Sequence, residues 1–336
     1  MTVPPAAVVV CAYTTARWGQ LQAAVRSTLA QTSPPVEVVV VVDHCDELLA
    51  MAGHLERPAA AGNPAVRVIA NADTRGLSGA RNTGVCAVGA DIVAFLDDDA
   101  VADATWLAEL VRHFDDPDVV GVGGRVVPVW SGPEPAWLPA EFHWVVGCSY
   151  TGLPDTTAEV RNPIGASMAF RRAPLLDVGG FSSTVGRVGT TPLGCEETEL
   201  SIRLVRRLPG ARILYEPRSV VHHHVAGERA RWGYFRRRCW AEGLSKARVA
   251  QLSDPRRALS AERRYAARVL PLGLAREVRG AVRTRRGAHL ARAAASLAGL
   301  ALAAGGYAVG QLSSPATSPA LRPTPLKGLA CPPSST

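Results

Sequence analysis

The chain lacks the paired cysteines that disulfide-stapled and zinc-binding proteins share. Its seven cysteines stand alone, and no Cys-x-x-Cys spacing occurs. An odd number of scattered cysteines argues against a disulfide framework, and the missing spacing argues against a structural zinc site. The N-terminus also lacks a charged lead followed by an apolar core, so we expect no signal peptide. Both absences favour a reducing compartment, and we expect a cytoplasmic protein.

Two further absences exclude classes of function. The turn after the first apolar run, Cys11–Thr15, contains no glycine, whereas a nicotinamide dehydrogenase needs a glycine-rich fingerprint there. The sequence shows neither zinc-finger spacing nor an RNA-binding aromatic signature. We therefore expect neither a nicotinamide cofactor nor a nucleic-acid partner.

Acidic residues are scarce in the second part of the chain. Residues 1–200 carry 12 Lys or Arg and 23 Asp or Glu, whereas residues 201–336 carry 25 Lys or Arg and 6 Asp or Glu. The acidic part suits the binding of a cation. The basic part suits an anionic partner, such as a membrane surface or a phosphate-bearing substrate.

Apolar runs and helix-like stretches alternate along the first hundred residues. The apolar runs are Ala6–Cys11, Val36–Val42, Val66–Ala70 and Ile92–Leu96, and the helix-like stretches are Trp18–Ala30, Glu47–Leu55 and Ser78–Val88. This alternation predicts an α/β fold with a mostly parallel central sheet flanked by helices. Further along, the pattern predicts helices at Ala104–Phe114 and Glu196–Arg207, strands at Val119–Val129, Gly165–Phe170 and Arg212–Tyr215, and an irregular region at Ser131–Asp155.

Polar residues follow each of the four apolar runs, where ligands bind to parallel sheets. They are Thr14, Asp43, Asp73 with Arg75, and Asp97-Asp98-Asp99. Three adjacent carboxylates repel one another, and Mn²⁺ or Mg²⁺ would relieve that repulsion while taking its other ligands from substrate phosphates and water. Residues i and i+2 of an extended segment point the same way, so we expect Asp97 and Asp99 to share the metal. A solvated acidic turn is the alternative interpretation.

Three more groups are candidates for the same site. Glu196 and Glu197 open a predicted helix, where carboxylates either favour the helix dipole or supply a general base. Arg75 and Arg81 flank a glycine-containing loop and are candidates for binding a diphosphate. His222-His223-His224 cannot all face one site. Our candidate metal ligands within this run are His222 and His224, and a polar edge strand is the alternative.

Taken in order, these segments resemble the family 2 glycosyltransferases, which are inverting enzymes with a GT-A fold. The resemblance rests on Val8–Thr14, Glu37–Asp43, Arg75–Gly84, the DXD-like Phe95–Asp99, and Glu196-Glu197 at the position of the family's acid pair, and it spans roughly residues 6–250. The chain departs from the family at Asp43–Asp46, which lacks the usual Asp-Gly-Ser. Thr14–Trp18 replaces an Asn-rich turn and is similar to a subgroup that acts on lipid-linked sugars.

The resemblance implies transfer of a sugar from a nucleoside-diphosphate sugar, with a UDP-sugar favoured, to a hydroxyl acceptor on a glycan or a lipid. It implies that Asp43 and Asp73 contact the nucleoside, that Asp97 and Asp98 lie on the donor side, and that Asp99 ligates the metal. Glu197 is then the catalytic base, with Glu196 beside it. Thr14, Arg75 and Arg81 complete the expected donor site.

Two other interpretations of these residues stay open at this point. A sugar-1-phosphate nucleotidyltransferase shares a similar sheet but has no need of the late acidic helix. A non-catalytic carbohydrate-binding protein would not need Asp97–Asp99 and Glu196-Glu197 together.

The C-terminal part predicts a different environment. We expect a catalytic domain at residues 1–228, a basic helical extension at 229–312 and a disordered tail at 313–336. The apolar stretch Leu290–Leu312 is about long enough to cross a bilayer, which needs roughly 20 residues. A helix packed on the catalytic domain, a helix lying on an anionic membrane surface at the inner face of the cell membrane, and a true span are the three alternatives.

Overall fold

The computed structural model describes residues 4–60, 62–183, 195–252 and 260–312. Its central sheet has the strand order β3-β2-β1-β4-β8-β6-β9-β5, with β7 paired to β9. The strands are β1 (Ala6–Ala12), β2 (Glu37–Val42), β3 (Ala65–Ala70), β4 (Ile92–Asp97), β5 (Ala100–Ala102), β6 (Val119–Trp130), β7 (Ala158–Glu159), β8 (Ser167–Arg171) and β9 (Arg212–Val225). Strands β1 to β4 are parallel, whereas β8 pairs antiparallel with β4 and β6. This α/β architecture confirms the predicted fold class.

Helices cover both faces of the sheet, as the continuous apolar strands require. The first six are α1 (Trp18–Leu29), α2 (Asp46–Ala52), α3 (Leu77–Ala87), α4 (Trp106–Val111), α5 (Arg172–Asp177) and α6 (Glu196–Arg207). Alternate residues of β1 join two separate cores: Val8 and Val10 pack with α1, α2 and α4, whereas Val9 packs with α3, α5 and α6. The carboxyl ends of β1, β2 and β4 stay uncovered by these layers and line a cavity.

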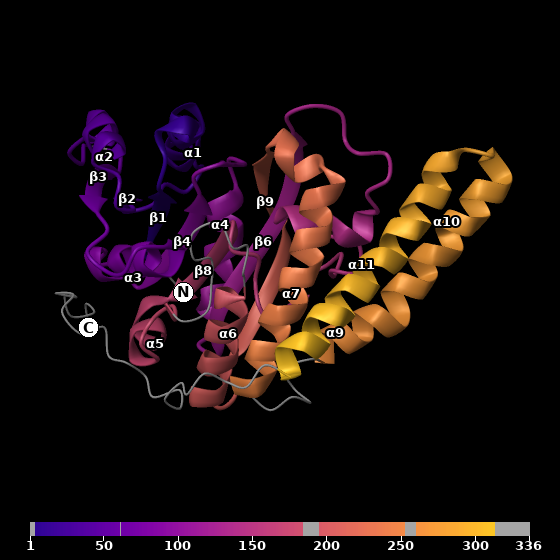
Figure 1. Ribbon diagram of the computed structural model, residues 1–336. Helices are drawn as coiled ribbons and strands as arrows, with labels where there is room; N and C mark the ends of the chain where they lie inside the picture. The colour runs from indigo at the N-terminus through magenta and orange to yellow at the C-terminus, as the bar shows by residue number, and fades with distance from the viewer. Residues whose placement is uncertain (1–3, 61, 184–194, 253–259, 313–336) are drawn as a thin grey trace.

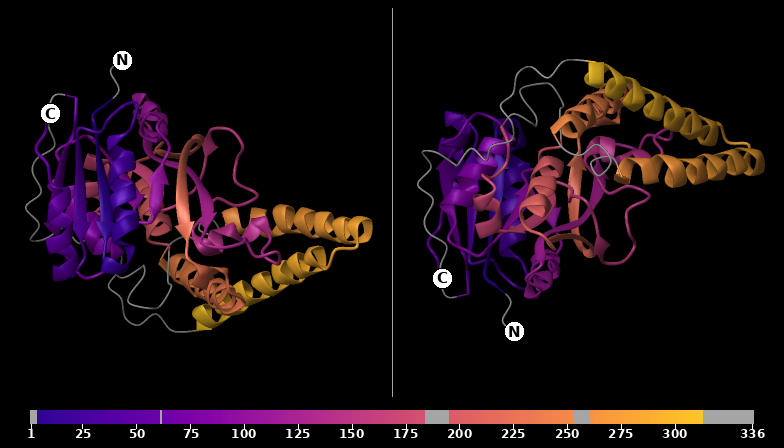
Figure 2. Two further views of the ribbon diagram at one scale, coloured as in Figure 1. Left: turned by 90° about the horizontal axis from the view of Figure 1, so that it is seen from above. Right: turned by 90° about the horizontal axis from the view of Figure 1, so that it is seen from below.

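The basic part of the chain forms a helical extension beside the sheet. Its helices are α7 (Trp232–Leu252), α9 (Ser260–Arg264), a π-helical turn (Tyr265–Val269), α10 (Leu270–Thr284) and α11 (Gly287–Leu312). Helices α10 and α11 form a hairpin that projects from the body of the molecule, and α11 returns along α7 (Figures 1 and 2). The proposed domain boundaries remain a prediction, and the segment 313–336 lies outside the described residues.

Most predicted elements are found within one or two residues of their expected bounds, and the differences have local causes. The expected helix Ala104–Phe114 is shorter, because α4 ends at Val111 and a 3₁₀ turn follows at Arg112–Asp115. The region predicted to be irregular contains a 3₁₀ helix at Ala140–Val146. The expected strand Arg212–Tyr215 continues to Val225, because β9 pairs with β6 along its length and then with β5.

The cysteines follow the expectation with one exception. Cys11, Cys45, Cys148, Cys195 and Cys239 are free thiols. Cys86, on α3, is disulfide-bonded. This bond is an exception to the expected absence of a disulfide framework.

Candidate functional site

A large cavity of about 2150 Å³ joins the strand ends to the helical extension. Its walls include Asp43 after β2, Asp97–Asp99 after β4, and Glu196 and Glu197 at the start of α6. Residues of α7, α9, α10 and α11 also line it. The two parts of the chain that differ in charge therefore enclose one space.

The aspartate run lies where β4 ends and β5 begins. Asp98 and Asp99 are buried, and Asp97 is partly exposed toward the cavity. Strand β5 pairs antiparallel with β9 and sets Ala100 opposite His223, which brings the Nε2 atom of His223 within 3.2 Å of Oδ1 of Asp99. One ligand atom from each of Asp97, Asp99 and His223 lies within 4.8 Å of the others. Two carboxylates and an imidazole form a donor set that suits a divalent cation.

The histidine run points its side chains in alternate directions, as successive residues of a strand do. His222 lies 2.9 Å from Asp103, and His224 lies between Gln20 and Ser131. The side chain of neither residue reaches Asp97 or Asp99, so the geometry favours His223 as a ligand over the predicted His222 and His224. The register of β9 against β5 determines which histidine faces Asp99, and the sequence of the histidine run alone does not reveal that register.

Arginines on one side partly balance the aspartates. Arg17 lies 2.9 Å from Asp98 and 3.0 Å from Asp99, and Arg229 lies 3.8 Å from Asp99. Burial raises the pKa of Asp98 to about 7, with Arg17 opposing the shift and the neighbouring carboxylates adding to it. Although burial raises the pKa of Asp99, His223, Arg17 and Arg229 together hold it below its ordinary value. Asp99 is therefore ionised, as a metal ligand must be.

Glu196 and Glu197 lie in the first turn of α6 and face a single guanidinium. Arg81 reaches Glu196 at 3.3 Å, Glu197 at 3.7 Å and Asp97 at 3.5 Å, and it also donates to the carbonyl oxygen of Gly165. Arg81 is 2% exposed, so its charge is committed to these carboxylates. The geometry places Arg81 between the acid pair and the aspartates, whereas the sequence suggested a free phosphate-binding arginine.

The environment of Glu197 suits a group that exchanges a proton near neutral pH. Burial raises the pKa of Glu197 to about 7, and the charge of Glu196 adds to the shift while Arg81 opposes it. Gly165 lies so close to the Glu197 carboxylate that a Cβ atom at position 165 would come within 2.0 Å of Oε1 of Glu197. A base whose pKa lies near the working pH is ionised in a substantial fraction of molecules and is basic enough to accept a proton.

The remaining predicted donor residues divide into two groups. Asp43 and Arg75 line the cavity, where Asp43 accepts hydrogen bonds from Asn71 and from the backbone of Gly76. Thr14 and Asp73 are not among the residues that line it. Thr14 caps a 3₁₀ turn through the backbone of Ala16, and Asp73 binds Thr74 and Asn82. The geometry thus gives these two residues roles in shaping the turns beside the donor end.

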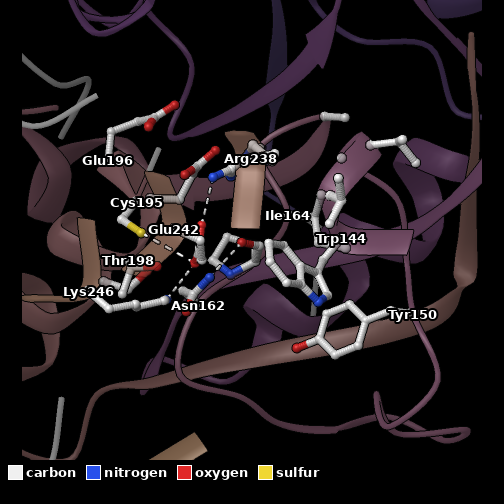
Figure 3. Close-up of a pocket in the computed structure, with 18 of the residues that line it drawn as sticks. Trp144, Tyr150, Asn162, Ile164, Cys195, Glu196, Thr198, Arg238, Glu242 and Lys246 are labelled. Carbon is white, nitrogen blue, oxygen red and sulfur yellow. Dashed lines mark hydrogen bonds and ion pairs between the residues drawn. The ribbon is translucent and has the colours of Figure 1, made fainter. Parts of the chain in front are cut away.

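A second group of charged residues at the cavity wall was missed by the sequence analysis. We name it the rear cluster: Glu242, Glu262, Arg161, Arg238 and Lys246. Figure 3 shows Arg238, Glu242 and Lys246 beside Cys195 and Glu196, with Trp144 and Tyr150 on the other side of the pocket. Lys246 bridges Glu242 and Glu262, and Arg161 joins Glu262 from the loop before β8. Arg238, Glu242 and Lys246 follow an i,i+4 spacing on α7 that the sequence displays, whereas the links to Glu262 and Arg161 join distant segments and leave no local motif.

The comparisons with known proteins identify the family. The sequence profile of "Glycosyl transferase family 2" matches residues 7–179. The chain belongs to glycosyl transferase family 2. It is therefore a glycosyltransferase, and the dehydrogenase, nucleotidyltransferase and non-catalytic interpretations are set aside.

Two relatives of this family 2 enzyme match different shares of the chain. The chain is 35% identical over 253 residues to a glucosyl-dolichyl phosphate glucuronosyltransferase from Haloferax volcanii, covering 74% of this chain and 78% of the relative. It is 31% identical over 159 residues to a pre-mycofactocin glycosyltransferase from Mycobacterium tuberculosis, covering 47% of this chain and 32% of that protein.

A solved structure with the same fold is a mannosyltransferase from Pyrobaculum calidifontis in complex with GDP-mannose and Mn²⁺. The TM-score is 0.57 and the sequence identity 18%, with 93% of this chain and 88% of that chain covered. At this identity the likeness shows the GT-A fold alone, and it confirms the fold that the sequence predicted.

Proposed function

We propose that this enzyme transfers a sugar with inversion from a nucleoside-diphosphate sugar, with a UDP-sugar favoured, to a hydroxyl group of a lipid-linked or polysaccharide acceptor. The observation that carries the proposal is the position of one raised-pKa carboxylate, Glu197, across Arg81 from the cation-binding group of Asp97, Asp99 and His223. The cation-binding group supports departure of a diphosphate, and Glu197 supports activation of a hydroxyl.

The residues that we assign to the donor end fit a bound Mn²⁺ or Mg²⁺. Asp97, Asp99 and His223 supply three ligand atoms, and Oδ2 of Asp98 is a buried oxygen without a hydrogen-bond partner among the described residues. A cation held here neutralises the charge that develops on the leaving diphosphate. Arg17 and Arg229 lie on the same side and add positive charge toward the phosphates.

Glu197 then acts on the acceptor. Its carboxylate accepts the proton of the acceptor hydroxyl while the oxygen forms a bond to the anomeric carbon. The bond from that carbon to the diphosphate oxygen breaks at the same time, and its electron pair leaves with the diphosphate. Attack from the side opposite the leaving group inverts the configuration in a single displacement.

A direct experiment separates this proposal from retention. Product stereochemistry at the anomeric carbon is read by proton NMR from a reaction with an α-linked UDP-sugar and Mn²⁺, using a panel of sugars. A β-linked product is expected. An α-linked product would reject the inverting mechanism and the role of Glu197 as base.

We further propose that the helical hairpin rests on an anionic membrane surface at the cytoplasmic face. Among the described helices, α11 is long and apolar enough to cross a membrane, and 28% of its most apolar window is buried. One face of α11 is exposed and apolar along its length, and we name it the apolar seam: Leu290, Ala294, Leu297, Ala301, Ala304 and Ala308. Helix α10 adds exposed apolar residues, including Leu272 and Val282.

Charge on the hairpin favours the surface position over a span. Arg279, Arg283, Arg285 and Arg286 are exposed near the tip, and the single acidic residue of α10 and α11, Glu277, is buried among Arg276, His289 and Arg292. Arginines beside an apolar face are typical of helices that lie in the interface.

Co-sedimentation with vesicles tests this surface. The full chain is expected to bind vesicles that contain phosphatidylglycerol more strongly than neutral vesicles, with binding that weakens as salt rises. The Arg279→Glu/Arg283→Glu variant should lose this preference, whereas the Arg206→Glu/Arg207→Glu variant, exposed on α6, should keep it. Equal binding of all three proteins to both lipids would reject the proposal.

A further inference from the structure

The cavity extends well beyond the groups that the transfer reaction uses. Trp144 and Tyr150 line it across from Glu242 and Lys246 (Figure 3). Helix α11 also lines it, through residues that include Leu300, Ala304 and Tyr307. A donor nucleotide would occupy the opposite end, at Asp43 and Asp99. The far end is therefore available to the acceptor.

Helix α11 divides this far end from the surface of the protein. Its glycines pack closely against neighbouring elements: a Cβ atom on Gly299 would come within 2.4 Å of Phe142, and one on Gly306 within 2.3 Å of the carbonyl oxygen of Trp240. The apolar seam lies on the side of α11 that faces away from these glycines. Ala304 belongs to the seam and also lines the cavity, and its neighbour Leu300 lines the cavity while remaining 39% exposed. The cavity thus opens at the edge of an exposed apolar surface.

Two arginines of α9 line the same cavity. Arg263 and Arg264 line the cavity, are exposed, and form no ion pair within the part of the chain that the structure describes. Arg161, Arg238 and Lys246, in contrast, are committed to Glu242 and Glu262. The π-helical turn that follows directly, Tyr265–Val269, is a distortion that recurs at functional sites. The cavity therefore combines free positive charge with an apolar wall.

We propose that this opening is a subsite for a lipid phosphate that carries the acceptor hydroxyl. The phosphate binds Arg263 and Arg264, and the aliphatic chain leaves the cavity between Leu300 and Ala304. The hydroxyl end points along the cavity toward Glu197. This inference rests on the proposed function, because it assigns the acceptor of that reaction.

The test uses farnesyl monophosphate as the probe, at concentrations below its micelle threshold, with isothermal titration calorimetry on the full chain. Saturable binding is expected, with weaker binding of farnesol and of inorganic phosphate. Ala304→Trp should weaken binding about tenfold or more by filling the opening. Ala301→Trp is the matched control, because Ala301 is an exposed seam residue of the same helix that is not among the cavity-lining residues. Its binding should stay within about twofold of the unaltered protein.

The charged half of the subsite is tested in the same way. Arg263→Ala/Arg264→Ala should weaken binding of farnesyl monophosphate about tenfold and leave binding of farnesol unchanged. Equal losses from Ala301→Trp and Ala304→Trp, or no saturable binding by the unaltered chain, would overturn the inference. If Ala304→Trp does not fold, Leu300→Gln decides the question with the same probe.

Binding of UDP with Mn²⁺, measured on the same samples, separates the two proposals. A protein that binds the nucleotide and transfers sugar to a water-soluble acceptor, but does not bind farnesyl monophosphate, retains the proposed function and lacks this subsite. If the unaltered protein binds farnesyl monophosphate but the Glu197→Gln variant is as active as the unaltered protein, the subsite is supported and the assignment of Glu197 as the base fails.

Discussion

Two carboxylates on the wall of the same cavity, Glu197 and Glu242, differ in their counter-charges. Each side chain is 17% exposed. Glu242 has Arg238 at 2.8 Å and Lys246 at 3.3 Å, and although burial raises its pKa, these cations bring it down to about 2. Glu197 shares the more distant Arg81 with two other carboxylates, and its pKa rises to about 7.

This contrast separates a reactive carboxylate from a structural one. Burial without enough positive charge leaves a group ready to take a proton, whereas burial with two close cations fixes its charge. Perturbed pKa values mark functional sites only in combination with geometry, because ion-pair networks perturb them too. The rear cluster joins the helical extension to the core, and the acid pair faces the substrate space.

The largest expected effect lies at the metal-binding group. Asp99→Ala should reduce kcat/KM about a thousandfold or more, because a lost ligand removes several kcal/mol of stabilisation from the departing diphosphate. Asp103→Ala is the control, since its side chain is 47% exposed and pairs with His222. Initial rates with Mn²⁺ and with EDTA provide the measurement. Near-normal turnover of Asp99→Ala in EDTA would show that no metal acts here.

Glu197→Gln directly tests the difference between Glu197 and Glu242. It should reduce kcat by roughly 10²–10⁴, the usual contribution of a general base, and leave the affinity for UDP nearly unchanged. Glu196→Gln should cost less. Glu242→Gln makes the same chemical change at equal exposure and should alter kcat by less than about tenfold, because that carboxylate does not take the proton. A greater loss of kcat in Glu196→Gln or Glu242→Gln than in Glu197→Gln would assign the base to that residue instead.

The fold and the site were predictable to different degrees, for physical reasons. The strands β1, β2 and β4 are buried on both faces, so each is a nearly continuous apolar run that the sequence displays. The carboxyl ends of these strands then bring Asp43 and Asp97 to one cavity without further information.

The histidines and arginines depend on contacts that the sequence does not display. Whether His223 or its neighbours face the aspartates depends on the pairing of β5 with β9. The role of Arg81 depends on α3 packing beside the start of α6, which turns an apparent phosphate ligand into a partner for Glu196. The rear cluster joins Arg161 to Glu262, about a hundred residues away.

A smaller effect is expected in the pH dependence. Because Glu197 must be ionised to accept a proton and its pKa is raised to about 7, kcat should fall about tenfold per pH unit below that value. Asp98, with a pKa also raised to about 7, could produce a similar slope. The pH dependence of the residual kcat of Glu197→Gln discriminates between the two groups. If kcat of this variant still falls below pH 7, the slope arises from another group. If its kcat no longer depends on pH, the slope of the unaltered enzyme arises from Glu197.

The smallest effects, in stability, should have opposite signs at the two carboxylates. Glu197 has a folded-state pKa above its ordinary value of 4.5, so its ionised form costs stability above that pH, and the cost is complete above about pH 7. Glu197→Gln should therefore stabilise the fold at pH 8, by about 1–3 kcal/mol. Glu242 has a folded-state pKa of about 2, so it contributes stability that is present above pH 4.5 and lost as the pH falls toward 2.

Glu242→Gln should accordingly destabilise the fold at pH 8, by about 3 kcal/mol. Urea unfolding at pH 8 and pH 4, followed by circular dichroism, measures both variants beside Glu47→Gln, an exposed control on α2. The difference between the two variants should shrink at pH 4, where Glu197 is protonated in both states and the contribution of Glu242 is partly lost. Destabilisation of equal size in both variants would mean that Arg81 neutralises Glu197 as fully as Arg238 and Lys246 neutralise Glu242, and the distinction between the two carboxylates would fail.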